Sequence, residues 1–342
     1  MANTLDAVKK YADNDKKSVV PTSKGQGIIV TDAPSVTALK VADVLIKSCG
    51  GRLAEAGWHE INAYDLKKIK GIKNLTRAEL EPMFYELRRM GYSHFDEEKD
   101  ELTIGGLLDI AKVQFSEASG TTKIRWKFSE MFRELVQASD HWAVIDRQTM
   151  FALRSKYSIL LFQHLSAFFP LKHIWFKQYT VAELRAILNV ADGVNKQFAF
   201  LNRDVLKPAV AEINQLSRYQ IKMEMVKSGR TVMGVKFTWD EKPDLVPVKR
   251  ELGSSKTGRK ARRDGTAETP ALTFPEFGTI RDTQPWDRIA RDNAPKLTGG
   301  HVPDLRKLAD AFRKWCAEKS VKPDAVSIEK TFTTWCKSYS DR

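Results

Sequence analysis

The chain has 342 residues, of which 42% are hydrophobic, including 17 Phe and 8 Trp. At roughly 150 residues per domain there is room for two domains and part of a third. This apolar content excludes a wholly disordered protein. Against 43 Asp and Glu stand 56 Lys and Arg, so the formal charge is +13. Such an excess favours a polyanionic partner: DNA, RNA or an anionic membrane surface.

Signatures of enzymes, membrane proteins and secreted proteins are missing from the sequence. It has no GxxxxGKS or GxxxxGKT phosphate loop, no HxH or HExxH pair and no GxSxG elbow. No apolar run approaches the roughly 20 residues of a bilayer span, and the segment MANTLDAVKKYADNDKK lacks the apolar core of a secretory signal. Cys49, Cys316 and Cys336 form no CxxC pair. We therefore expect a cytoplasmic protein with no catalytic centre, no metal and no cofactor.

The first part of the chain predicts an arm followed by a winged helix. Residues 1–33 are polar and are expected to form a flexible arm. Over 34–145, apolar residues first recur at helical spacing, the short helix AYDLKKI follows, and a third helix begins at Thr76 with the capping-box residue Glu79. Two extended stretches joined by SEASGTT come next. The second alternates apolar and basic residues, which is typical of a strand with one buried face.

The same order repeats over 146–242 with little sequence identity. Residues 153–169 and 180–190 predict two helices, the second capped by Thr180 with Glu183 three positions on. The turn ADGVN leads to a third helix, and YQIKMEMVKSGRTVMGVKFTWD reads as a β-hairpin that turns at KSGR. We interpret the two segments as tandem winged-helix domains.

The C-terminal third of the chain predicts a linker and a small helical element. Residues 243–284 contain seven basic residues and one acid between Lys249 and Arg263, and are expected to be a basic disordered linker that either tethers or tracks phosphates. Residues 285–342 show two amphipathic helices, expected to form a helical hairpin that packs on itself or docks on a partner. The expected fold class is therefore α+β, with two winged helices, this linker and this element.

Candidate DNA contacts follow from the docking of helix-turn-helix proteins, whose second helix enters the major groove. Arg suits guanine, Asn and Gln suit adenine, and Lys mostly meets phosphate. Polar side chains of the second module's third helix that could reach a groove are Lys196, Gln197, Asn202, Arg203 and Lys207, and those of its wing are Lys222, Lys227 and Arg230. In the first module the candidates are Arg77, Arg88, Arg89, Lys123, Arg125 and Lys127, with a solvated basic face as the alternative.

Two further features of that third helix bear on which side chains face outward. Four apolar residues are expected to face the core: Phe198, Leu201, Val205 and Leu206. Pro208 cannot donate a helical hydrogen bond, so the helix is expected either to begin near it or to bend there.

Three segments of the second module resemble a known family. SKYSILLFQHL, the run VL-x-PAVAEIN from Val205 to Asn214, and GRTVMGVKFTW are similar to the iteron-binding plasmid replication initiators of the RepA, RepB and RepE type. The resemblance is specific over about 150–242 and only topological over 34–145. By family position Asn202, Arg203 and Lys207 carry base and phosphate contacts, whereas Asp204 stands where basic residues are common.

The resemblance implies a plasmid replication initiator that binds direct repeats, called iterons, in double-stranded DNA at a replication origin. It also implies opening of adjacent AT-rich DNA and recruitment of the host replication initiator and the replicative helicase. A monomer–dimer equilibrium is implied as well, in which dimers formed through the first module repress the protein's own promoter and control plasmid copy number.

Three other functions remain open at this point. A winged-helix transcriptional regulator without an initiation role would share the DNA chemistry and bind a single inverted repeat. A rolling-circle nickase would need a nucleophilic tyrosine, with Tyr64, Tyr85, Tyr157 and Tyr219 available, and a pair of metal-binding His that the sequence lacks. A non-specific basic scaffold would bind by charge alone.

Overall fold

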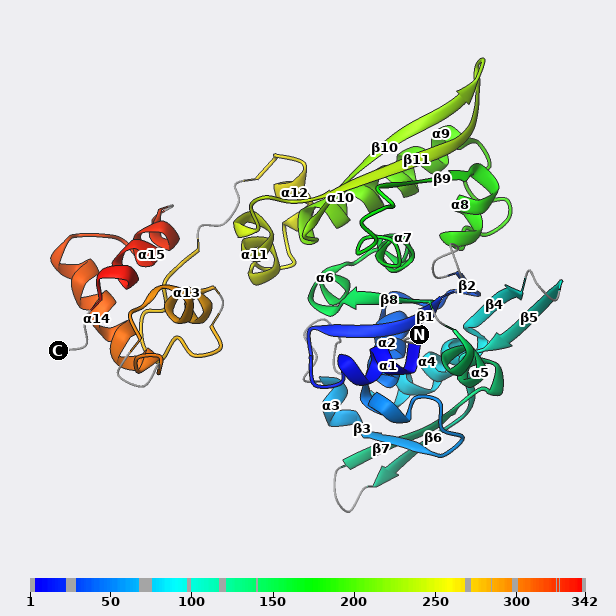
Figure 1. The fold of residues 1–342 in the computed structure, drawn as a ribbon, viewed down its shortest axis with the longest axis horizontal. Coiled ribbons are helices and arrows are strands. Elements are labelled where there is room, and N and C mark those ends of the chain that lie inside the picture. Colours follow the sequence, from blue (N-terminus) through cyan, green and yellow to red (C-terminus); the bar gives the residue numbers. More distant parts are fainter. Residues whose placement is uncertain are drawn as a thin grey trace. The chain divides into compact units, whose positions relative to one another are not determined.

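The computed structural model divides into two compact units, Met1–Lys242 and Pro243–Arg342, shown in Figure 1. The residues that it describes are 4–22, 29–67, 76–96, 100–116, 121–139, 141–267, 272–283, 285–296, 301–323, 325 and 327–339.

The first winged helix combines three helices with a three-stranded antiparallel sheet. Its helices are α2 (Val36–Cys49), α3 (Ala63–Lys67) and α4 (Arg77–Arg89), and its sheet has the order β3 (His59–Asn62), β7 (Thr121–Phe128), β6 (Leu108–Ser116). The capping box at α4 is confirmed, because the Thr76 N–H donates to Glu79 Oε2 at 2.8 Å. The predicted alternation in β7 also holds: Ile124, Trp126 and Phe128 are buried, and the three basic residues lie on the outer face.

Two further elements complete this module. A hairpin that the sequence analysis did not identify, β4 (Gly91–Asp96) and β5 (Glu101–Gly106), is inserted between α4 and β6 and pairs with β2 (Val30–Thr31). After β7 comes α5 (Glu130–Ala138), whose N-cap Ser129 accepts from the Phe132 N–H at 3.1 Å.

The N-terminal residues are not a flexible arm, and that expectation is wrong for residues 4–22. Helix α1 (Thr4–Lys10) packs on the first module, and β1 (Lys17–Thr22) pairs antiparallel with β8 (His141–Asp146) along its whole length. Val19 and Val20 are buried. The polar composition was misleading because the backbone partner of β1 lies more than a hundred residues further along the chain, where no local pattern reveals it.

Two charged side chains of α2, Lys40 and Asp43, hydrogen-bond to the segments that precede and follow the first module. Asp43 accepts from Arg147 Nε at 2.8 Å, where Arg147 begins α6 (Arg147–Ala152), and also accepts from the Ser18 hydroxyl of β1. Lys40 Nζ donates to the carbonyls of Phe151 and Leu153 at 2.9 and 2.7 Å. These two side chains therefore connect β1, α2 and the segment that leads into the second module.

The second winged helix has the same layout as the first. Its elements are α7 (Lys156–Ser166), β9 (Phe176–Thr180), α8 (Val181–Ile187), α9 (Phe198–Leu201), a π-helical turn (Asn202–Leu206), α10 (Lys207–Leu216), β10 (Tyr219–Ser228) and β11 (Thr231–Glu241). The sheet order is β10–β11–β9. The predicted capping box of Thr180 and Glu183 is present, and the hairpin turns at Gly229, whose φ of +61° suits glycine.

The second unit is helical throughout its regular elements. They are α11 (Val246–Gly253), α12 (Arg259–Arg263), α13 (Trp286–Asn293), α14 (Leu305–Glu318) and α15 (Ile328–Ser338). The amphipathic stripes of α14 and α15 pack with α13 around Phe274, Phe312 and Phe332, with ring centroids 4.7–4.9 Å apart. The aromatic residues of this tail therefore form a core of their own, in agreement with the expectation that the helical element packs on itself.

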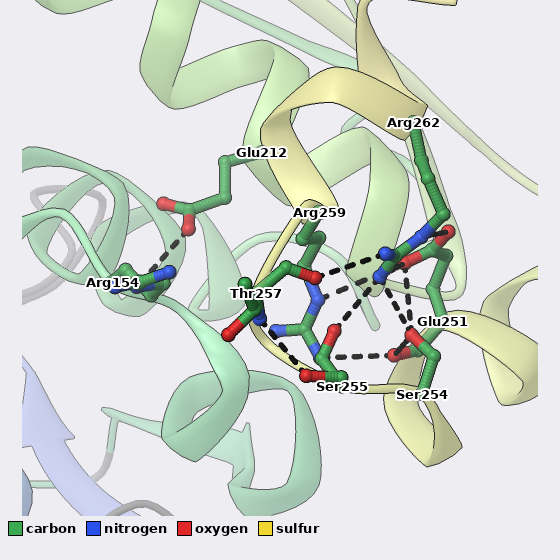
Figure 2. Close-up of polar contacts among 8 residues, drawn as sticks. All are labelled: Arg154, Glu212, Glu251, Ser254, Ser255, Thr257, Arg259 and Arg262. Carbon is green, nitrogen blue, oxygen red and sulfur yellow. Dashed lines mark hydrogen bonds and ion pairs between the residues drawn. The ribbon is translucent and has the colours of Figure 1, made fainter. Parts of the chain in front are cut away.

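The expectation of a disordered linker is wrong for α11 and α12. Glu251 is buried, and Arg262 donates to its two oxygens at 2.8 and 2.9 Å, as Figure 2 shows. Two arginines of α12, Arg259 and Arg262, are held by this one carboxylate. Because charged groups and not apolar residues make these contacts, the sequence shows no apolar periodicity that would predict the two helices. None of the helices in the described part of the chain has the length and apolar character that a bilayer crossing requires.

Candidate nucleic-acid interface

The third helix of the second module runs through Pro208 with a widened turn. The Lys207 N–H donates to the carbonyl of Asn202, five residues back, which makes Asn202–Leu206 a π-helical turn. A regular α-helix would require an N–H at position 208 for the carbonyl of Asp204, and proline has none. The α-helical segment α10 begins at Lys207 with Pro208 in its first turn, so the expectation that a helix begins near Pro208 is confirmed. The π-helical turn connects this segment to α9, a feature that the sequence did not predict.

One side of this helix is buried and the other carries the candidate contacts. Leu201, Val205 and Leu206 are fully buried, as predicted, whereas Phe198, which was predicted with them, is only half-buried. The exposed candidates are Lys196, Gln197, Arg203 and Lys207. Asn202 differs from the expectation: it is 8% exposed, and within the described residues its Oδ1 accepts no hydrogen bond. The π turn shifts the helical register, and this places Asn202 on the buried side.

Arg203 is exposed but already paired. Its Nε and Nη2 donate to the two oxygens of Asp204 at 2.7 and 2.9 Å, and its guanidinium lies 5.1 Å from the ring centroid of Phe200. The hydrogen bonds from Arg203 hold the pKa of the Asp204 carboxyl below its usual value. Phe200 is 41% exposed and was missed by the sequence analysis, although it lies three residues before Arg203 and seven before Lys207.

The turn that presents this helix is fixed by Arg185 of α8. Its guanidinium donates to the carbonyls of Ala191, Val194 and Asn195 at 3.1, 2.7 and 3.0 Å. Gly193 within the turn has a φ of +84°, a conformation that glycine adopts without strain. The turn ADGVN therefore holds the start of α9 in one position relative to α8.

The other end of the helix is held by the AEIN segment. Glu212 is buried and accepts from the backbone N–H of Arg154 at 2.9 Å, as Figure 2 shows. It also accepts from the backbone N–H of Ser155 at 3.3 Å, just before α7 begins. Asn214 exchanges two hydrogen bonds with the backbone of Ile221 in β10, at 2.7 and 2.8 Å. These polar residues position the helix, with Glu212 buried and Asn214 half-buried.

The predicted wing residues are all exposed on the β10–β11 hairpin. Lys227 and Arg230 flank the turn at Gly229, and Lys222 lies nearer the body of the module. The register of the hairpin shifts between Val226 and Lys227. Such an irregularity increases the twist of a ribbon, so the tip of the wing is oriented separately from its base.

The candidates of the first module lie in two separate places. Arg88 and Arg89 are exposed at the end of α4, while the side chain of Arg77 lies outside the described residues. On the outer face of β7, Lys123 Nζ and Arg125 Nε lie 3.3 and 3.7 Å from the carboxylate of Glu60. Glu60 thus offsets part of the positive charge there. Lys127, further along β7, lies with Lys112 and Arg125 around the ring of Trp58.

The described residues contain no group of three or more His, Cys, Asp or Glu that could hold a metal ion. His164, for example, is buried and shares a hydrogen bond of 2.8 Å with the Tyr179 hydroxyl. The chemistry that this surface supports is recognition by hydrogen bonds, charge and apolar contact.

Comparison with solved structures finds 23 matching chains, among them the following two. The crystal structure of the Pi initiator protein in complex with iteron DNA matches at 18% identity and a TM-score of 0.47, covering 65% of this chain and 100% of that one. Domains 2 and 3 of RctB match at 9% identity and a TM-score of 0.38, covering 70% and 98%. No curated protein matches.

Two family models match the chain and supply the assignment. The model described as "Initiator Replication protein, WH1" covers residues 31–166, and the one described as "Initiator Rep protein, WH2" covers residues 180–239. Together they span more than half of the chain, and neither describes an enzyme. The chain therefore belongs to the family of Rep replication initiators with two winged-helix domains.

Proposed function

We propose that this chain binds direct repeats in double-stranded DNA at a plasmid replication origin, with the α9–α10 helix in the major groove. The observation that carries the proposal is the exposed stripe of Phe200, Arg203 and Lys207 on a helix whose opposite face is buried. The three side chains are all exposed, whereas Leu201, Val205 and Leu206 between them are buried. The family assignment supports the same role, and the Pi initiator is a relative in structure that was crystallised with iteron DNA.

Each exposed residue suits a different contact. Arg203 can give two parallel hydrogen bonds to guanine, and Phe200 can contact a thymine methyl group. The lysine side chains, including Lys207 and Lys227, suit phosphates. Because Asp204 occupies the same donors of Arg203 that guanine would use, a base must replace the carboxylate. Arg203 therefore favours a site that offers two good acceptors over DNA that offers only charge.

The proposal includes self-association through the first module. Strand β5 is an edge of its sheet within the described residues, and it exposes Leu102 and Ile104 at 57% and 68%. Exposed apolar residues on an edge strand favour pairing with a second copy. Sedimentation of an Ile104→Lys variant would test this, since a charge on the strand should shift the equilibrium to the monomer.

The remaining family properties complete the proposal: a cytoplasmic protein without a catalytic centre, opening of AT-rich DNA, recruitment of the host initiator and the replicative helicase, and repression of its own promoter by the dimer. Incubating origin plasmid with the protein and a divalent metal tests the first of these, because a covalent protein–DNA adduct would indicate a nickase.

Selection of binding sites from a random duplex pool, followed by salt titration of the winner, tests the central claim. We expect an asymmetric site of roughly 20 bp, as two modules in adjacent grooves would cover at about 10 bp per turn. Tandem copies of it should then be found at an origin. An enriched palindrome alone would indicate a transcriptional regulator. No enrichment with a steep salt dependence would indicate binding by charge alone.

A further inference from the structure

The two winged helices can be aligned residue by residue through their sheets. The strand orders are β3–β7–β6 and β9–β11–β10. In both sheets the middle strand is the second strand of the hairpin, and it lies between the strand that precedes the second helix and the first strand of the hairpin. The first strand runs directly into the second helix in each case. His59 pairs with the buried Trp126, and Lys177 pairs with the buried Phe237. Trp58 therefore corresponds to Phe176 in the other module.

A cation lies over the aromatic ring at this position in both modules. The Arg125 guanidinium is 5.0 Å from the Trp58 ring centroid, and Lys236 Nζ is 4.6 Å from that of Phe176. Arg125 pairs with Glu60 and Lys236 pairs with Gln178, so the two cations also occupy equivalent positions of the middle strand. The modules share little sequence, yet the same pair recurs.

Each pair belongs to a larger surface on the outer face of its sheet. Around Trp58, Lys112 and Lys127 place their ammonium groups 4.9 and 5.3 Å from the ring centroid. Beside Phe176, Trp175 packs edge-on at 4.8 Å and has Lys236 at 5.2 Å. We call these two surfaces the outer sheet sites.

A purely structural role does not account for the exposure of Trp175 and Phe176 in the second module. Trp175 is 60% exposed and Phe176 is 39% exposed, so most of the Trp175 indole contributes nothing to the core. The cations beside them lie on strands between buried residues and therefore face away from the helices. These faces are thus separate from the α9–α10 helix that we assign to duplex DNA.

Exposed rings interleaved with cations match the chemistry of one ligand class. Single-stranded DNA offers unpaired bases that stack on aromatic rings and one phosphate per nucleotide for Lys and Arg. A duplex hides the faces of its bases, and an acidic peptide offers charge without rings. Contacts between rings and cations that solvent reaches are weak, so the cations can move to phosphates when bases stack. We propose that the outer sheet sites bind single-stranded DNA.

The inference rests on the proposed function, because an origin-binding protein meets single strands when the neighbouring AT-rich DNA opens. It does not rest on the residues that contact the duplex.

The test compares fluorescein-labelled oligo-dT with the selected duplex in anisotropy titrations of the full chain. A Trp175→Ala/Phe176→Ala variant should lose about ten-fold or more in affinity for oligo-dT, since each base–aromatic stack is worth about that much. Its affinity for the duplex should stay within about two-fold of the wild type. Trp175→Phe, which keeps a ring, should retain single-strand binding. Phe277→Ala, at an 84% exposed ring of the second unit, is the matched control and should change neither affinity.

The inference would be overturned by a wild-type chain that does not bind oligo-dT, or by a Trp175→Ala/Phe176→Ala variant that binds it as the wild type does. Competition by poly-glutamate equal to that by oligo-dT would also overturn it, because charge alone would then explain binding. Failure of the proposed function would give a different result. In that case the duplex pool yields no site, while oligo-dT binding and its dependence on Trp175 and Phe176 persist.

Trp58→Ala tests the first module separately. Because Trp58 is half-buried, its circular dichroism and duplex affinity are measured first. Where both match the wild type, an unchanged affinity for oligo-dT removes the first module from the inference. Where they do not, Lys112→Gln, at an exposed side chain, replaces it and is read in the same way.

Discussion

Replacing Arg147 with methionine should destabilise the first unit strongly, because it leaves a buried charge without its partner. Asp43 is 2% exposed and accepts from Arg147 Nε at 2.8 Å. Arg147 also donates to the carbonyl of Asp15 at 2.9 Å and lies 5.0 Å from the ring centroid of Phe151. Removing one partner of a buried ion pair typically costs about 3–5 kcal/mol of unfolding free energy.

The contacts around Arg147 set the expected loss of unfolding free energy within this range, and they predict that a second substitution restores stability. Ser18 still donates to Asp43 in the variant, which limits the loss, whereas the Asp15 carbonyl loses a bond worth about 1 kcal/mol. We expect a net loss of about 4 kcal/mol for Arg147→Met. The double variant Asp43→Leu/Arg147→Met should cost much less, because apolar side chains of similar volume often replace a buried pair with little penalty.

Lowering the pH should partly restore the stability of the Arg147→Met variant. Burial raises the pKa of Asp43 above its usual value. An acid whose pKa is higher in the folded state is destabilising when ionised, so stability recovers as pH falls through the folded pKa. Without Arg147 this recovery should be larger than in the wild type.

Urea titration followed by circular dichroism measures these differences. Phe332→Ala, which perturbs only the core of the second unit, identifies the transition that belongs to that unit. A loss below about 1 kcal/mol for Arg147→Met, or a double variant no more stable than the single one, would refute the reasoning.

The remaining predictions concern one titration and three DNA contacts. Burial lowers the pKa of His59 in the folded protein, so His59 is protonated at a higher pH in the unfolded chain than in the folded one. Lowering the pH from 7.5 to 5.5 should therefore reduce the free energy of unfolding by up to about 1.4 kcal/mol. His59→Phe should abolish this difference between urea titrations at pH 5.5 and 7.5. Arg203→Ala should cost about 1–3 kcal/mol on the selected site and less on random duplex, and equal losses in anisotropy titrations would make it a phosphate contact. Asp204→Asn should strengthen binding to random duplex and reduce the ratio of the two affinities, since it frees Arg203; an unchanged ratio would contradict this. Lys227→Ala should reduce the salt slope by about 0.9, and an unchanged slope would remove the wing from the contacts.

Local signals in the sequence predicted the local structure well. The Thr180–Glu183 capping box begins α8 where expected, because both partners lie within one turn of helix. The alternation around Trp126 marked the buried face of β7 in the same way. For the same reason the Gly229 turn was placed correctly.

Elements that depend on distant partners could not be predicted. Strand β1 needs β8, and α11 with α12 needs a carboxylate whose arginine lies eleven residues further on. Neither interaction leaves a periodic trace in the sequence. The orientation of Asn202 was missed because the π turn before Pro208 shifts the helical register by one residue.

The residues that carry the family resemblance are not those that would read DNA. Glu212 and Asn214 hydrogen-bond the α10 helix to the segment before α7 and to β10. The exposed side chains at Phe200 and Arg203 have no such structural duty in the core. The segment that carries the resemblance therefore holds the helix in place, and it carries no information about the base sequence that is bound. That sequence depends on side chains that can change without loss of the fold, which is why site selection is needed even though the family is assigned.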